Sequence, residues 1–86
     1  MKLYKLVDHI DRYEVLDFGK NNDSILFSHG KPIAAIIKDK AYICGKPSFL
    51  SDADNFGIYE FFGGYVKSLY RDVFYVEPEE IENYLV

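Results

Sequence analysis

The sequence predicts a single α+β domain over residues 1–86, with a small antiparallel sheet of three to five strands and two or three helices packed on one face. Three observations support this. Residues 25–44 are short apolar runs separated by short polar turns, which is typical of an antiparallel meander. Apolar residues then recur at helical spacing in the second half of the chain. Finally, a chain of 86 residues can bury one modest core.

The first eighteen residues are compatible with both a helix and a strand. The apolar residues that recur with the spacing of one helix face are Leu3, Leu6, Val7, Ile10 and Tyr13. Tyr13, Val15 and Asp17 equally fit a strand that ends at Gly19. We expect a short helix near residues 3–12 and a strand near residues 13–18.

Residues 28–31, Ser-His-Gly-Lys, lie between the apolar runs 25–27 and 33–37. Gly30 suits the positive φ of a tight turn. Pro32 lacks a donor N–H and therefore belongs at the start of a strand. We interpret 28–31 as a hairpin turn.

Helices are predicted mainly in the second half of the chain. Residues 51–55 offer N-cap side chains and early acidic groups. The apolar residues that follow at helical spacing are Ile58, Phe61, Phe62, Tyr65, Val66 and Leu69. The glycine pair at 63–64 predicts an end, a kink or a close approach of another element. Residues 72–76 predict a strand, and Pro78 suits the first position of a final helix.

Charge and cysteine content limit the class of protein. The net charge is −4, with the acidic residues concentrated in residues 47–86, and this argues against a nucleic-acid-binding protein. The single cysteine, Cys44, rules out an internal disulfide. The first residues do not match a secretory signal, and no uncharged run approaches the ~20 residues of a spanning helix. We therefore expect a cytoplasmic protein with no membrane partner.

The residues that could carry catalysis or hold a cofactor do not form a complete set. Ser28 and His29 are adjacent, and adjacent strand residues point to opposite faces, which argues against a nucleophile–base pair. On a helix, Asp8 and Asp11 share a face while His9 points away, so a solvated face is the simpler interpretation than a metal site. We expect no enzymatic activity, no metal and no cofactor.

The rings and glutamates of the second half form the predicted partner-binding surface. Tyr59 and Phe61 cannot both face one core from the same helix, so at least one ring should reach the surface. The glutamates near the C-terminus suit the first turn of a helix, or an acidic patch for a basic partner. The candidate residues are Tyr59, Glu60, Phe61, Tyr65, Tyr70, Glu77, Glu79, Glu80 and Glu82.

Residues 26–36, LFSHGKPIAAI, resemble a pattern found in a group of small phage-encoded proteins of unknown function. That pattern is L-[FY]-S-Y-x-T-P-[VI]-A-x-I, and it precedes a tyrosine-bearing strand. The matching residues are Ser28, Pro32, Ile33, Ala34 and Ile36, whereas His29 replaces a tyrosine and Lys31 a threonine. The resemblance implies a viral protein in the host cytoplasm and transfers no catalytic residue.

These observations predict a small acidic protein-binding module. By analogy with other small acidic phage proteins, we expect a stoichiometric inhibitor of a host protein, of the anti-defence or anti-CRISPR-like kind. Two alternatives remain open. One is a structural viral protein that forms a homodimer or larger homo-oligomer. The other is a weak nucleic-acid-binding module that stacks bases on its rings beside Lys31 and Lys46.

Overall fold

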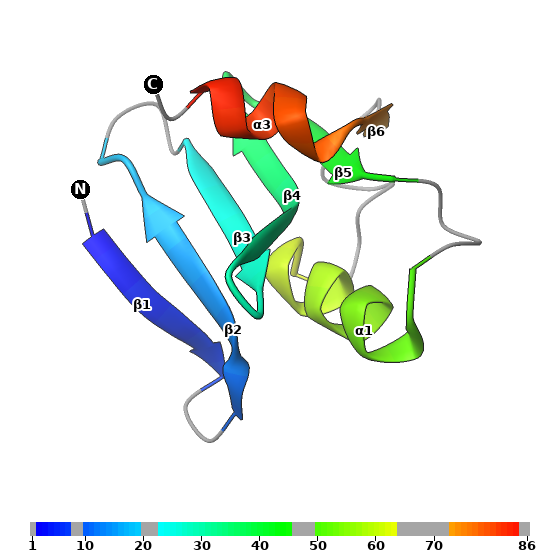
Figure 1. Ribbon diagram of the computed structural model, residues 1–86. Coiled ribbons are helices and arrows are strands. Elements are labelled where there is room, and N and C mark those ends of the chain that lie inside the picture. Colours follow the sequence, from blue (N-terminus) through cyan, green and yellow to red (C-terminus); the bar gives the residue numbers. More distant parts are fainter. Residues whose placement is uncertain (1, 8–9, 20–22, 46–49, 64–72, 85–86) are drawn as a thin grey trace.

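The computed structural model describes residues 2–7, 10–19, 23–45, 50–63 and 73–84. Six strands form one sheet in the order β1-β2-β3-β4-β5-β6 (Figure 1). The strands are β1 (Lys2–Val7), β2 (Ile10–Asp17), β3 (Ser24–Ser28), β4 (Lys31–Ile37), β5 (Lys40–Cys44) and β6 (Val73–Val76). The helices in these residues are α1 (Asp52–Phe61) and α3 (Pro78–Tyr84). Neither helix of the described ranges is long and apolar enough to cross a membrane.

The sheet is larger than predicted and mixed in direction. Strands β1 to β5 pair antiparallel as a meander, which confirms the pattern of residues 25–44. Strand β6 pairs with β5 in parallel, so the expected antiparallel sheet of three to five strands is wrong in strand number and in this pairing. Parallel neighbours need a long crossover, which here includes α1. The α+β class holds, but a local pattern does not reveal the direction of a distant strand.

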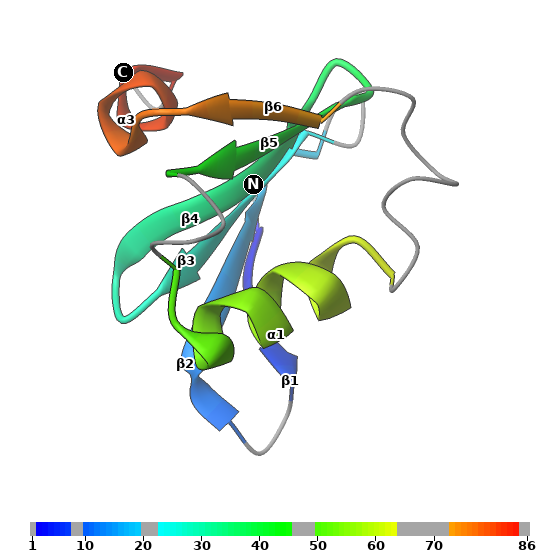
Figure 2. The same cartoon turned by 90° about the vertical axis from the view of Figure 1, so that its right-hand side faces the viewer.

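The two helices cover opposite faces of the sheet, not one face as predicted (Figure 2). Leu26 and Ala34 belong to a core with Ile58 of α1. Their chain neighbours belong to a second core with Ile81 of α3, and these are Ile25 and Ala35. Consecutive strand residues point to opposite faces, so apolar pairs such as Ile25-Leu26 place apolar side chains on both faces of the sheet. Each face must therefore be buried by a packed element.

The helix predicted over residues 3–12 is also wrong, because this segment forms β1 and the start of β2. In the register of the two strands, Leu3 lies opposite Leu16 and Tyr4 lies opposite Val15. The spacing of the apolar residues is compatible with either structure, and pairing with β2 decides between them. The strand predicted over residues 13–18 is confirmed within β2 and begins three residues earlier than expected.

The interpretation of residues 28–31 as a turn is confirmed. His29 and Gly30 have φ values of 52° and 79° and join β3 to β4. Positive φ at both central residues is the geometry of a type I′ turn, which matches the twist of paired strands. The next hairpin repeats it, with φ values of 51° at Lys38 and 64° at Asp39.

The local signals of the second half are confirmed where the structure describes them. Ser51 caps α1, and its hydroxyl accepts a hydrogen bond from the Asp54 N–H at 3.1 Å. Strand β6 and a helix starting at Pro78 occur as expected. Helix α1 ends at Phe61, just before the glycine pair. The predicted helical positions Tyr65, Val66 and Leu69 lie outside the described residues.

Candidate partner-binding surface

Helix α1 exposes part of the predicted aromatic surface. The Tyr59 side chain is 53% exposed, and Glu60 is also exposed. Phe56, one helical turn before Tyr59, is 46% exposed. Phe61 packs against the core beside Phe62, with ring centroids 5.2 Å apart, so it contributes mainly to packing. Tyr65 and Tyr70 lie outside the described residues.

The predicted glutamates lie at the start of α3 and just before it. Glu77, Glu79, Glu80 and Glu82 are all exposed. Glu80 also stabilises its own helix, because its carboxylate accepts a hydrogen bond from the Glu77 N–H at 3.0 Å. The Glu80 N–H also donates to the Glu77 backbone carbonyl at 3.0 Å, and we call these two hydrogen bonds the reciprocal cap. Glu80 therefore has a structural role that Glu79 and Glu82 do not share.

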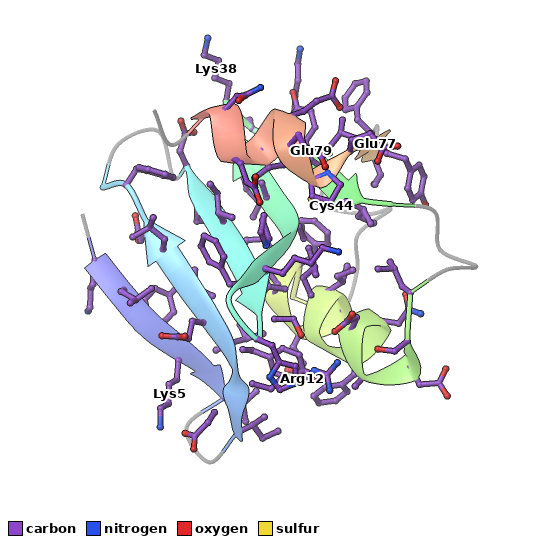
Figure 3. All side chains as sticks on the ribbon, viewed as in Figure 1. Lys5, Arg12, Lys38, Cys44, Glu77 and Glu79 are labelled. Atoms are coloured by element: carbon purple, nitrogen blue, oxygen red, sulfur yellow. The ribbon has the colours of Figure 1, made fainter. Side chains whose placement is uncertain are left out.

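Glu77 and Glu79 lie near Cys44, where β5, β6 and α3 meet (Figure 3). Burial raises the pKa of the Cys44 thiol to about 12. Lys31 lowers this pKa, whereas Glu82, Glu77 and Glu79 raise it further. All three carboxylates belong to residues 77–82, are exposed and act on the same thiol. We call Glu77, Glu79 and Glu82 the acidic cluster.

We expect Cys44 to be inert toward alkylation in the folded protein. Its side chain is buried, at 4% exposure, and a pKa of about 12 leaves almost no thiolate at neutral pH. Iodoacetamide at pH 8 should modify the folded protein at least ~100-fold more slowly than the urea-unfolded chain. Mass spectrometry measures both rates. Equal rates would contradict the burial of Cys44 at this junction.

The structure adds two surface residues that sequence reasoning did not identify, Phe74 and Tyr75 of β6. Their exposed fractions are 39% and 54%. The run Val-Phe-Tyr-Val lacks polar alternation, which is typical of a strand buried on both faces. The rings are exposed because β6 is the last strand of the described sheet. The signal available in the sequence was the position of this run, immediately before the glutamates.

The predicted surface thus divides into two separate parts. Tyr59 and Glu60 belong to α1 and lie on one side of the sheet, whereas the acidic cluster accompanies α3 on the other (Figure 2). The acidic cluster is instead continuous along the chain with Phe74 and Tyr75. We call residues 73–82 the β6–α3 surface.

The residues considered for a nucleophile–base pair and for a metal site have structural roles where they are described. The Ser28 hydroxyl donates to Asp54 at 2.8 Å and accepts from Arg12 at 3.0 Å, while His29 sits in an exposed turn. Asp11 pairs with Lys5, and the other two members of the candidate metal set, Asp8 and His9, lie outside the described residues. Among the described residues, no group of three His, Cys, Asp or Glu side chains could hold a metal.

A small cleft borders the acidic cluster. Its volume is about 290 Å³, at the lower limit of small-molecule sites, and it lies between the starts of α1 and α3. Lys31, Asp54 and Glu77 supply its charged groups. Asp54 is already bound by Arg12 and Ser28, so its carboxylate is committed to the fold.

No family model, no curated protein and no solved structure matches the chain.

Proposed function

We propose that the protein is a non-enzymatic module that binds a basic region of another protein through the β6–α3 surface. The observation that carries this proposal is that two exposed rings and three exposed carboxylates follow one another on a single continuous segment. Aromatic anchors supply most of the affinity at such interfaces, whereas peripheral charges set specificity and the rate of encounter.

The charge of the surface defines the class of partner. The acidic cluster attracts Lys-rich and Arg-rich surfaces and repels phosphate, which disfavours the nucleic-acid alternative. The resemblance to small phage proteins leads us to place the partner in a host cell, where the module would inhibit it by stoichiometric binding. Helix α1, with Tyr59 and Glu60, would then remain outside this contact because it covers the opposite face.

A paired charge reversal tests the proposal. Glu79→Lys with Glu82→Lys changes the acidic cluster and leaves the reciprocal cap of Glu80 intact. Asp52→Lys with Glu60→Lys changes net charge by the same amount on exposed positions of α1. Tagged wild type and both variants are used to capture proteins from bacterial lysate, and mass spectrometry quantifies the bound proteins.

We expect the wild type and the α1 variant to retain one host protein at equal molar ratio. The α3 variant should retain at least ~10-fold less, because like charges then face each other across the contact. Equal loss in both variants would indicate a general charge effect and would contradict the assignment to the β6–α3 surface. Failure of the wild type to retain a stoichiometric partner would contradict the proposed function itself.

A further inference from the structure

We propose that the partner binds as an extended basic segment that adds to the free edge of β6 as a seventh strand. This inference rests on the proposed function and specifies how the β6–α3 surface recognises its partner. No strand of the described residues lies beyond β6. An unpaired strand edge presents N–H and C=O groups that can pair with another chain.

The hydrogen bonds of β6 identify the groups that face outward. The Gly45 N–H donates to the Val76 carbonyl at 2.9 Å, so the backbone polar groups of Val76 point toward β5. Outward and inward residues alternate along a strand, and therefore Phe74 also points its backbone groups toward β5. Val73 and Tyr75 direct their N–H and C=O groups away from β5. They offer two donors and two acceptors to an added strand.

The two edges of the sheet differ in their protection against strand addition. Strand β1 carries Lys2 and Lys5, and its register is interrupted between Lys5 and Val7. Charges and bulges of this kind are common defences of edge strands. Strand β6 contains no charged residue and no proline, and its register with β5 is uninterrupted. Among the described residues, the edge with fewer of these defences is thus the one that adjoins the acidic cluster.

Side chains of an added strand would find contacts on both faces. Phe74 extends the α3 face and packs on Tyr42 with ring centroids 5.5 Å apart. Tyr75 lies beside Ile43 in the register and extends the α1 face. Each ring is partly exposed because the row of side chains that it continues ends there. A seventh strand would cover both rings at once.

Charge favours a basic segment over a second copy of this protein. The chain has a net charge of −4, and self-association through β6 would bring a second acidic cluster to the same edge. Antiparallel pairs are slightly more stable per residue than parallel ones. An antiparallel segment would place its amino-terminal end beside Glu77, so its basic residues should lie at that end.

A synthetic peptide that stands in for the partner segment tests the inference. The probe has eight residues, with two arginines followed by alternating valine and threonine, and both ends are blocked. Control peptides carry glutamate in place of arginine, or N-methyl groups on the edge that would pair. Hydrogen exchange of the assigned backbone amides is followed by NMR with the full chain at millimolar peptide.

We expect the arginine peptide to slow exchange of the Val73 and Tyr75 amides at least ~10-fold, since both become hydrogen-bonded. The glutamate peptide should bind at least ~10-fold more weakly, and the N-methylated peptide should not slow exchange. Tyr75→Pro should abolish the effect, because proline removes the outward donor and is tolerated at a strand edge. Tyr75→Thr keeps the donor and should retain pairing.

The alternative outcomes separate the two proposals. Spectral changes confined to α3, with unchanged exchange at Val73 and Tyr75, would overturn strand addition and leave the acidic surface standing. No change anywhere would count against both proposals. In the protein alone, the Val73 and Tyr75 amides could exchange slowly, and their protection could increase with protein concentration. This result would make a second copy the occupant and would overturn the choice of a basic segment.

Discussion

Replacing Gly57 with alanine is expected to destabilise the protein by about 1–3 kcal/mol, although alanine is the better helix former. Gly57 lies in α1 where the helix faces the ring of Tyr13 from β2. An ideal Cβ at this position would lie 2.5 Å from Cε1 and 2.8 Å from Cδ1 of Tyr13. Real Cβ atoms do not approach other atoms this closely, so either the ring or the helix must move.

The Tyr13 ring has little freedom to move. Its side chain is 2% exposed, and its hydroxyl donates a hydrogen bond to the Ala53 carbonyl in the first turn of α1. Displacing the ring would therefore break a partly buried hydrogen bond, and displacing the helix would open the core. This steric cost should exceed the ~1 kcal/mol that alanine contributes to helix propensity.

Urea denaturation of Gly57→Ala measures the change in the free energy of unfolding. Glu60→Ala, at an exposed position of the same helix, serves as a control and should change it by less than ~0.5 kcal/mol. Combining Gly57→Ala with Tyr13→Leu should reduce the cost of the alanine, because the ring is gone. A stabilisation by Gly57→Ala alone would contradict the close packing of α1 on the Tyr13 ring.

Replacing Asp54 with alanine is expected to cost about 2–3 kcal/mol. One carboxylate oxygen of Asp54 accepts from the Ser28 hydroxyl at 2.8 Å and from Arg12 Nη2 at 2.9 Å. Arg12 Nε also donates to Ser28 at 3.0 Å, so three side chains from β2, β3 and α1 form one network. The side chains of Arg12 and Asp54 are 31% and 20% exposed, which limits the cost relative to a fully buried pair.

Asp52→Ala provides the matched control, since Asp52 is also in the first turn of α1 but is exposed. Its loss should cost only about 0.3–1 kcal/mol through the helix dipole. Equal costs at Asp52 and Asp54 in urea denaturation would show that the network contributes nothing beyond the position in the helix.

The Asp54 network also predicts a pH dependence of stability. Burial raises the pKa of Asp54, but hydrogen bonds from Ser28 and Arg12 outweigh burial and hold it below its ordinary value of 3.8. A lowered pKa in the folded state contributes stability above pH 3.8, and this stability is lost as the pH falls through the folded-state pKa. In Asp54→Asn, the free energy of unfolding should therefore fall less steeply below pH 3.8, as measured by urea denaturation at several pH values. Lys5 lowers the pKa of exposed Asp11 in the wild type and in the variant alike. The difference between their pH dependences of stability therefore reports Asp54 alone.

The sequence allowed correct predictions of the turns, caps and helix starts that depend on a few neighbouring residues. The turn at His29-Gly30, the cap at Ser51 and the start of α3 at Pro78 follow from a few neighbouring residues, and all three are confirmed. The hairpins follow from short turns that leave antiparallel pairing as the simple connection.

The predictions that were wrong concern features that depend on contacts between distant segments. Residues 3–12 have a spacing that suits a helix, but hydrogen bonding between β1 and β2 makes them strands. Apolar residues on both faces of β3 and β4 required helices on both faces. The parallel pairing of β6 with β5 follows from a crossover that no local pattern encodes.

Only part of the candidate surface could be predicted from the sequence, because the rest also depends on contacts between distant segments. Exposed charge at α3 could be inferred from the glutamates, and Tyr59 is exposed as expected. The exposure of Phe74 and Tyr75 depends on which strand ends the sheet, and the separation of α1 from α3 depends on the faces that they cover. Both require the assembled sheet.

The contact proposed between the β6–α3 surface and a basic partner protein can be tested directly by one measurement. This is the molar ratio of captured host protein for wild type and for the two paired charge reversals. We expect equimolar retention by the wild type and by Asp52→Lys with Glu60→Lys, and at least ~10-fold less by Glu79→Lys with Glu82→Lys. Retention of the partner by the α3 variant and its loss from the α1 variant would contradict the proposed contact and move it to α1.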